Sequence, residues 1–373
     1  MSGTSALDAS RGHALPRVRA NRGANTAGQA FRLAEGGLVD RARPLAFTFN
    51  GRAYTGYAGD TLASALIANG VHLVGRSFKY HRPRGILAAG VEEPGALVQL
   101  GRGATAIPNL QATTLPLTEG LEARSVNVFP SVGFDIGAVN GWFSRLLPAG
   151  FYYKMFFGSR WAWRHLYEPV IRRAAGWGRA PDGPDPDLYD HRHRHCDVLV
   201  VGGGPAGLMA ARAAAAGGAR VMLCEADTRL GGSLLGADAS VDGQPGSVWV
   251  DSLAAELAAL PEVTVLPRTT VFGAYDDNYL CAIEDVTDGP VRQRVWHLRA
   301  GRVVLATGAH ERPLVFADND RPGVMLAGAV FEDVGQWKRP RHYPAAGETM
   351  VQAVARECAA VRRGVGILDA STL

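Results

Sequence analysis

The chain has 373 residues, of which 47% are apolar, and a formal net charge of +4. That length can build two or three domains with separate hydrophobic cores, and the charge is too small and too dispersed for a nucleic-acid-binding arm. The sequence contains no run of about 18 apolar residues, so it predicts no membrane span. Four cysteines without a C-x-x-C spacing predict free thiols in a reducing compartment, and they are Cys196, Cys224, Cys281 and Cys358.

The N-terminal region predicts a disordered extension followed by a β-hairpin. Residues 1–30 are rich in Ser, Gly, Ala and Arg and lack the apolar stretch of a secretory signal. From residue 44, alternating apolar and polar residues surround Asn50-Gly51. Both residues tolerate the positive φ of a type I′ turn, so this pair favours a hairpin.

A helix and a further strand should complete a small domain over residues 31–140. Asp60 can cap the helix and Gly70 can end it. The helix has an apolar face made of Leu62, Ala65, Leu66 and Ala68. The apolar run at 95–100 predicts the next strand. A hairpin, a helix and then a strand are typical of a small α+β domain of β-grasp type.

Residues 141–190 predict a connection between two domains. The segment 146–163 is aromatic but carries two basic residues, so we expect a packed connecting segment rather than a membrane anchor. The stretch from 169 to 186 is rich in proline and glycine, which predicts a linker without regular structure.

Three alternating histidines come next, and they could face a metal from one side of a strand. We favour a solvated lead-in to the following strand, and no metal, because further Cys or His ligands at a zinc spacing are missing nearby. The three are His191, His193 and His195.

Residues 191–330 predict a dinucleotide-binding domain with a parallel sheet. An apolar strand ends at Val201, a helix of small residues ends at Gly217-Gly218, and a second apolar strand ends at Glu225. Strand, helix and strand within about thirty residues form a βαβ unit. A later apolar strand leads into Ala306-Thr307-Gly308.

The glycines after the first strand fit G-x-G-x-x-G. Gly202 allows the sharp turn, Gly204 allows a pyrophosphate to approach the backbone, and Gly207 allows close packing of helix and strand. Phosphates would lie at the helix N-terminus. Glu225 stands where an acid hydrogen-bonds a ribose 2′-hydroxyl, which favours NAD or FAD over NADP. The alternative is that the glycines only shape a turn.

The glycine fingerprint, the acidic strand end, "LGGSL" at 230–234 and "LATGA" at 305–309 resemble flavoproteins with two dinucleotide-binding folds. In that superfamily the backbone near Val271 meets the adenine, and the Thr307-Gly308 turn lies over the dinucleotide. The resemblance therefore implies a cofactor-binding set of Gly202, Gly204, Pro205, Ala206, Gly207, Glu225, Ala226, Gly231, Gly232, Ser233, Val271, Ala306, Thr307 and Gly308.

Longer motifs, such as "SFKYHRPRGILAAGVEEPGALV" and "HERPLVFADNDRPGVMLAGA", resemble the α subunits of the heterotetrameric sarcosine oxidase family. The resemblance implies a cytoplasmic enzyme that oxidatively demethylates sarcosine to glycine, with the one-carbon unit passed to tetrahydrofolate and electrons passed to oxygen. It also implies NAD in this chain, with FAD as the alternative, flavins held with a β subunit, and further γ and δ partners.

Two departures from that family affect the expected activity. The N-terminal domain is similar to a [2Fe–2S] ferredoxin-like domain, but residues 44–140 contain no cysteine to ligate a cluster. Residues 331–373 resemble the start of an aminomethyltransferase-like folate-binding domain and follow the dinucleotide region at once. We therefore expect an internally deleted and truncated chain, with an incomplete dinucleotide domain, that is inactive when isolated.

Two other functions remain open. A stand-alone FAD oxidoreductase of the disulfide-reductase type lacks the redox C-x-x-C that it would need. A non-catalytic dinucleotide-binding fragment is favoured by the incomplete sheet.

No catalytic residue can be assigned from the sequence. The residues after the Ala306 turn could face a ligand, or Glu311 and Arg312 could pair at the surface. A second polar loop could line a subunit interface or contact the cofactor. These two groups are His310, Glu311 and Arg312, and His81, Arg82, Pro83 and Arg84.

Overall fold

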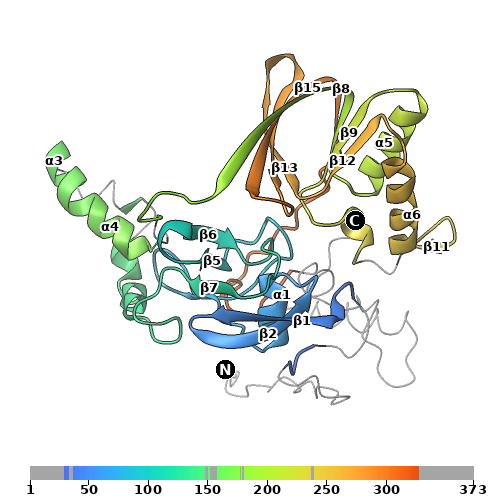
Figure 1. Cartoon of the computed structure of the whole chain (residues 1–373). Helices are drawn as coiled ribbons and strands as arrows, with labels where there is room; N and C mark the ends of the chain where they lie inside the picture. The colour runs from blue at the N-terminus through green and yellow to red at the C-terminus, as the bar shows by residue number, and fades with distance from the viewer. Residues whose placement is uncertain are drawn as a thin grey trace, which may run out of the picture.

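The structure is a computed structural model that describes residues 29–32, 37–147, 150–151, 158–176, 178, 180–236 and 239–326. The chain builds two larger β-sheets, and Figure 1 shows them as separate units, with the N-terminal sheet below the C-terminal one. Gln29 does not belong to a disordered extension, because it is 5% exposed and its side chain donates to the Thr55 carbonyl. Residues 1–28 and the predicted folate-binding segment 331–373 lie outside the described residues.

The N-terminal sheet has five strands in the order β2-β1-β7-β5-β6. Strand β1 pairs antiparallel with β2 and parallel with β7, and helix α1 packs on the sheet. This mixed sheet with one crossing helix confirms the predicted α+β domain of β-grasp type. Its elements are β1 (Asp40–Phe49), β2 (Arg52–Ala58), α1 (Leu62–Ala68), β5 (Leu97–Leu100), η1 (Gly103–Thr105), β6 (Ile107–Gln111) and β7 (Leu121–Ser125).

Local sequence rules explain both ends of the hairpin and of α1. Asn50 and Gly51 have φ of 52° and 77°, as the type I′ turn requires. Gly70 has a φ of 75°, and its N–H donates to Ile67 while the next N–H donates to Leu66, which forms a Schellman ending. The predicted cap is off by one residue, because the side chain of Thr61 accepts from the Ser64 N–H.

Asp60 has another role, since its carboxylate lies inside the domain. It accepts from the Tyr57 N–H at 2.8 Å and from the Ser64 hydroxyl at 2.7 Å, and it pairs with Arg32 at 2.6 Å. Both side chains of the ion pair are almost fully buried. Asp60 therefore ties the N-terminal residues to the start of α1.

The connection between the two sheets differs from both predictions made for it. Helix α4 spans Glu168–Ala175 and continues the helical turns of α3 and η4, so the expected linker is helical at its start despite Pro169. Leu146 and Trp161 are 63% and 67% exposed, so for these side chains the prediction of a packed segment is wrong. The other elements here are η2 (Ile136–Gly141), η3 (Ser144–Leu146), α3 (Arg160–Ala162) and η4 (Trp163–Tyr167).

The C-terminal sheet has six strands in the order β12-β9-β8-β15-β14-β13. The first four run parallel, and β14 and β13 continue the sheet antiparallel, which confirms the Rossmann-like class. The strands are β8 (Leu188–Val201), β9 (Val221–Cys224), β12 (Val263–Leu266), β13 (Thr269–Tyr275), β14 (Tyr279–Asp285) and β15 (Val291–Leu305).

Alternating strand side chains make a core on each face of this sheet. Val200 and Leu223 pack with the helices α5 and α6, whereas Leu199 and Met222 belong to the cluster on the other face. Figure 1 places α5 and α6 together on one side of the sheet. The remaining elements are α5 (Pro205–Ala216), η5 (Gly232–Leu234), β10 (Ser240–Val241), β11 (Gln244–Pro245), α6 (Gly246–Ala258) and η6 (Asp276–Asn278).

The strand β15 is paired unequally along its two edges. Its pairing with β8 continues to Leu305, but its pairing with β14 stops at Arg299. Within the described part of the chain, the last residues of β15 therefore have a strand on one side only, and Leu305 is 73% exposed. None of the described helices is long and apolar enough to cross a membrane.

The alternating histidines lie within β8 and are not a lead-in to it. Pairing between β8 and β15 extends over the histidine stretch, and the ring of His297 from β15 stacks on His191 and His193 at 5.5 and 4.5 Å. Desolvation lowers the pKa of His297, and the charges of His193 and His191 lower it further. Among the described residues, no three or more His, Cys, Asp or Glu side chains are arranged so that they could hold a metal ion.

Candidate dinucleotide-binding site

The first and third glycines of the fingerprint are required by packing within the chain. Gly202 has a φ of 103°, and a Cβ there would overlap the carbonyl oxygen of Ala306. A Cβ on Gly207 would overlap the carbonyl oxygen of Gly202 and would lie 3.3 Å from the Ala306 Cβ. Strand β8, helix α5 and the end of β15 therefore meet with no room for side chains at these positions.

Gly204 is different, because nothing in the described chain requires a glycine there. Its φ of −70° and ψ of −179° are open to any residue. A Cβ on Gly204 would have no neighbour closer than the Gly232 Cα at 4.0 Å. The described fold therefore leaves this backbone open to a group from outside it, which is the role that the fingerprint predicts for Gly204.

Helix α5 begins at this same point. Pro205 is its first residue, and Gly204 offers no side chain to cap the N–H groups of the first turn. Ala206 is exposed, and Gly207 is buried against the strand. Free N–H groups and the helix dipole suit this end of α5 for a phosphate.

Glu225 directly follows β9 and braces the glycine loop. Its carboxylate accepts from the Gly203 N–H at 2.6 Å and from the Asp227 N–H at 2.9 Å. Sequence reasoning assigned Glu225 to a ribose and missed the bond to Gly203. The two roles are compatible, because a carboxylate can accept more than two hydrogen bonds and Glu225 is only half-buried. Ala226, the next residue, is exposed.

The "LGGSL" stretch closes over the glycine loop from the other side. Gly231 has a φ of 127°, and its N–H donates to the Gly203 carbonyl at 2.9 Å. Gly232 follows with a φ of 50°, and a Cβ on it would lie 3.1 Å from the Gly204 Cα. Ser233 is exposed in η5. The structure thus brings these predicted residues and the fingerprint together.

The end of β15 lies against the glycine loop, whereas the Val271 side chain does not. Ala306 donates its N–H to Val201 and touches Gly202, and the next residues, Thr307 and Gly308, are exposed. The Val271 side chain packs on the core face that the helices do not cover. Its strand is still joined to the site, because the Thr269 N–H donates to the Glu225 carbonyl at 2.7 Å.

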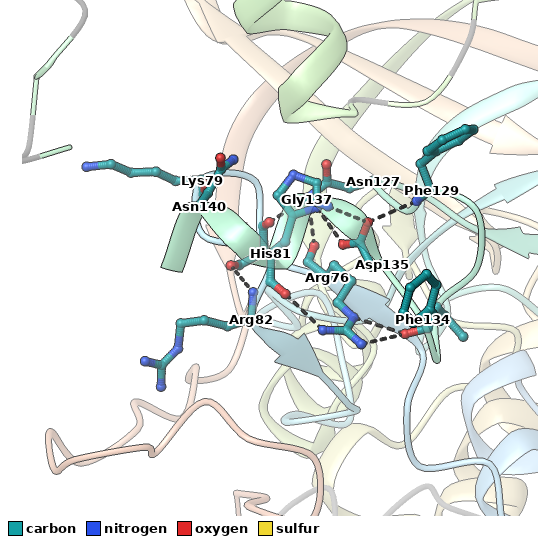
Figure 2. Close-up of polar contacts among 12 residues, drawn as sticks. Arg76, Lys79, His81, Arg82, Asn127, Phe129, Phe134, Asp135, Gly137 and Asn140 are labelled. Carbon is teal, nitrogen blue, oxygen red and sulfur yellow. Dashed lines mark hydrogen bonds and ion pairs between the residues drawn. The ribbon is translucent and has the colours of Figure 1, made fainter. Parts of the chain in front are cut away.

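His81 is held inside the N-terminal unit and does not face the glycine loop. It is 7% exposed, and its Nδ1 lies 2.6 Å from a carboxylate oxygen of Asp135. Figure 2 shows that carboxylate also accepting from the backbone of Phe129 and Gly137. Arg76 donates to the His81 carbonyl, at 3.1 Å. This arrangement fastens the loop around Asp135 to the loop that carries His81.

The arginines beside His81 connect the two halves of the chain. Arg82 binds Asp320 through two nitrogens at 2.6 and 2.8 Å and also reaches Asp318, while Arg84 pairs with Asp320. These bonds lower the pKa of Asp320, with the Arg82 hydrogen bonds the largest cause. Of the residues after the turn, His310 and Arg312 are exposed, and the contacts assign them no chemical role.

The described cysteines are unsuited to redox chemistry. Cys196, Cys224 and Cys281 are free and buried. Burial raises the pKa of Cys196 to about 11 and that of Cys224 to about 12, so these thiols are protonated at neutral pH. Cys358 lies outside the described residues.

Three family models match parts of this chain. They are the 2Fe-2S iron-sulfur cluster binding domain over residues 42–128, the FAD dependent oxidoreductases over 197–286 and the GCVT N-terminal domain over 324–373. Together with the βαβ unit and its glycine loop, the second match defines a dinucleotide-binding domain of the FAD-dependent oxidoreductase class.

Curated relatives narrow this class. The chain is 55% identical over 309 residues to sarcosine oxidase subunit alpha of Rhizobium meliloti strain 1021, which covers 81% of this chain and 31% of the relative. It is 43% identical to the subunit of that name from Corynebacterium sp. strain P-1, over 78% of this chain and 26% of the relative. The chain therefore belongs to the sarcosine oxidase α-subunit family over the part that it spans, which is between a quarter and a third of those relatives' length.

A solved structure supports the same fold. The L-proline dehydrogenase from P. horikoshii matches 85% of this chain and 52% of its own, with a TM-score of 0.51 at 19% identity. At this identity the likeness shows the fold alone.

The residues present do not fit the iron-sulfur cluster that the first family model implies. Such a cluster is held by four ligands, which are usually cysteine thiolates. The matched stretch 42–128 contains no cysteine.

Proposed function

We propose that this chain is the dinucleotide-binding part of an oxidoreductase that demethylates sarcosine to glycine. The observation that carries the proposal is Gly204, a glycine that neither backbone conformation nor packing requires, at the uncapped N-terminus of α5. The family relationship supplies the substrate class, since the relatives are named for sarcosine oxidation. A bound dinucleotide would take part in hydride transfer or, if it is NAD, would stabilise the structure without reacting.

The site suits the adenosine diphosphate half that NAD and FAD share. Glu225 can accept from a ribose hydroxyl and repels a 2′-phosphate, which supports NAD or FAD over NADP. The family resemblance of the longer motifs supports NAD, whereas the matched oxidoreductase model supports FAD. The cofactor-binding set proposed from the sequence converges on this region, with Val271 joined to it through its strand.

Cofactor identity can be tested by calorimetry on the purified chain. Titrations with NAD, FAD and ADP-ribose should give saturable binding of ADP-ribose, because it contains the shared half. NAD bound more tightly than FAD by a colourless protein would support the NAD form. Visible flavin absorbance in stoichiometric amount would decide for FAD, and no binding of any of the three would overturn the site.

The folate and subunit roles are also part of this proposal. The GCVT match starts the domain that would hold tetrahydrofolate for capture of the one-carbon unit. Exposed apolar side chains support β, γ and δ partners, since large exposed patches mark interaction sites. These exposed side chains lie in the segment after β7 and include Phe129, Phe134, Ile136, Trp142 and Phe143.

We expect the isolated chain to be inactive, because the proposed activity would also need the β, γ and δ partners. Hydrogen peroxide formation from sarcosine is measured with the chain alone and with added β, γ and δ subunits. Turnover by the chain alone would contradict this expectation.

A non-catalytic binding fragment is the second candidate, and it is favoured by the end of β15, which is paired on one side only among the described residues. Dinucleotide binding without any activity in the presence of the partner subunits would favour this second candidate.

A further inference from the structure

A single acidic side chain lies at the centre of the loop that precedes β5. Glu93 is 1% exposed, and its side chain is among the largest that are fully buried. One carboxylate oxygen accepts from the N–H groups of Leu87 and Ala88 at 2.6 and 2.7 Å. The other accepts from Gly95 and Ala96 at 2.6 and 2.8 Å. Four backbone donors therefore converge on one buried anion.

Burial of a carboxylate costs several kcal/mol unless its charge is compensated. None of the ion pairs found among the described residues includes Glu93. The compensation comes instead from charge-assisted bonds to N–H groups, which make an anion-binding nest. Because two donors precede Glu93 and two follow it, the carboxylate joins both limbs of the loop 87–96.

Neighbouring side chains complete the bonding of this loop. Gln111 donates to the carbonyls of Val91 and Glu93, at 2.6 and 3.0 Å, and Thr113 donates to Gly90 at 2.8 Å. Both donors come from the chain at and just after β6. The loop is thus ordered around its own carboxylate and fastened to the sheet from outside.

The same loop lies inside the stretch that matches the 2Fe-2S cluster binding domain. A cluster of that kind is a buried anionic group that takes its ligands from thiolates and accepts hydrogen bonds at its sulfurs. The loop here keeps converging N–H donors but has no cysteine. We propose that the Glu93 carboxylate replaces the cluster as the anion around which this loop folds, so that the nest is filled by the chain itself and is closed to metal.

This role extends to the contact between the two halves of the chain. Leu87, whose N–H binds Glu93, accepts at its carbonyl from the Leu326 N–H at 2.7 Å. The segment that leaves the C-terminal sheet therefore rests on a loop that the Glu93 charge holds in shape.

The test uses the full chain and removes the charge in two ways. Glu93→Gln keeps the shape but points an amide NH₂ at N–H donors, and it should lower the unfolding midpoint by about 10 °C. Hydrogen exchange in peptides covering 85–96 should rise at least about tenfold, since those amides lose their acceptor. Glu92→Gln is the matched control, because it removes one charge from the adjacent, half-buried position.

Chemical rescue distinguishes charge from shape. Glu93→Ala removes the atoms of an acetate ion, so acetate should restore exchange protection and midpoint, while acetamide at equal concentration should not. The wild-type chain with acetate controls for ionic strength. After incubation with ferrous iron and sulfide and removal of the free ions, the wild-type chain should hold far less than one iron per chain.

Several results would overturn the proposal. Wild-type stability and protection in Glu93→Gln would show that the charge is unnecessary. Equal rescue by acetamide would show that the side chain only fills space, and no rescue by acetate would show that the nest does not bind a free anion. Stoichiometric iron in the wild-type chain would show that the nest is open to metal.

Discussion

Two loops in this chain gather backbone N–H groups, and they do so for different occupants. The loop 87–96 closes on the carboxylate of Glu93, which is 1% exposed. The glycine loop after β8 carries no side chain at Gly204, and no atom of the described residues lies closer to the position of a Cβ there than the Gly232 Cα at 4.0 Å. Converging N–H donors thus indicate an anion, and the side chains of the loop decide whether the protein or a ligand provides that anion.

The largest expected effect tests whether packing alone needs a glycine in the second loop. Gly207→Val should destabilise the C-terminal unit by about 3 kcal/mol or more, because its Cβ would overlap the Gly202 carbonyl oxygen. Denaturant unfolding followed by tryptophan fluorescence measures the change, and exchange in peptides 85–96 should stay as in the wild type. Gly204→Ala is the matched control and should unfold like the wild type. Equal stability of Gly207→Val would contradict the close helix–strand contact.

The next effect separates ligand binding from folding. Gly204→Val should weaken ADP-ribose binding by about 100-fold or more, which is ~3 kcal/mol, while the unfolding midpoint stays unchanged. A Cβ at this position has no neighbour among the described residues closer than the Gly232 Cα at 4.0 Å, and a branched side chain would stand where a pyrophosphate approaches. Calorimetry and thermal unfolding are measured on the same sample. Unchanged affinity would mean that the second loop, like the first, serves the fold alone.

A smaller effect concerns the acid that braces the open loop. Glu225→Gln should weaken ADP-ribose binding by about tenfold, because the amide is a poorer acceptor for a ribose hydroxyl and for the Gly203 N–H. It should also reduce discrimination against NADP, since the negative charge is lost. Affinities for NAD and NADP give the ratio. A variant that still rejects NADP as the wild type does would place the ribose elsewhere.

The smallest effect concerns the ion pairs that join the two units. The pKa of Asp320 is lowered by Arg82, so its stabilising contribution is present above about pH 3.9 and is lost only as the pH falls further, through the lowered value. Asp320→Asn should cost about 1 kcal/mol or less, because Arg82 is 41% exposed. The protection of amides in peptides 313–326, after correction for the pH dependence of intrinsic exchange, should be constant from pH 7 to about pH 5 in the wild type. Loss of protection within that window would show that another group titrates.

Much of the site was predictable because its glycines obey local backbone rules. The turn at Asn50-Gly51 and the Gly202 fingerprint depend on a few adjacent φ angles, which a short sequence window contains. The nest around Glu93 was not predicted. Its only signal was a pair of glutamates before Pro-Gly in an otherwise apolar stretch, and that signal does not say where either side chain points.

The His81–Asp135 pair was missed for a related reason. The two residues are 54 positions apart, and each by itself is an ordinary loop residue. Their contact depends on how the loops before β4 (Pro83–Arg84) and after β7 fold back on each other, with Arg76 of β3 (Gly75–Arg76) between them. No periodicity along the sequence encodes such a meeting.

The sequence by itself determined the order of the units, the βαβ pattern and the glycine loop, because these follow from short-range periodicity and turn chemistry. Tertiary structure decided the length of β8, whose polar first half is a strand only because β15 lies beside it from Val291 onward. It also decided that Asp60 and Glu93 are buried. A side chain's solvation and partners depend on residues that are distant in sequence, so burial and pairing emerge only when the chain is folded.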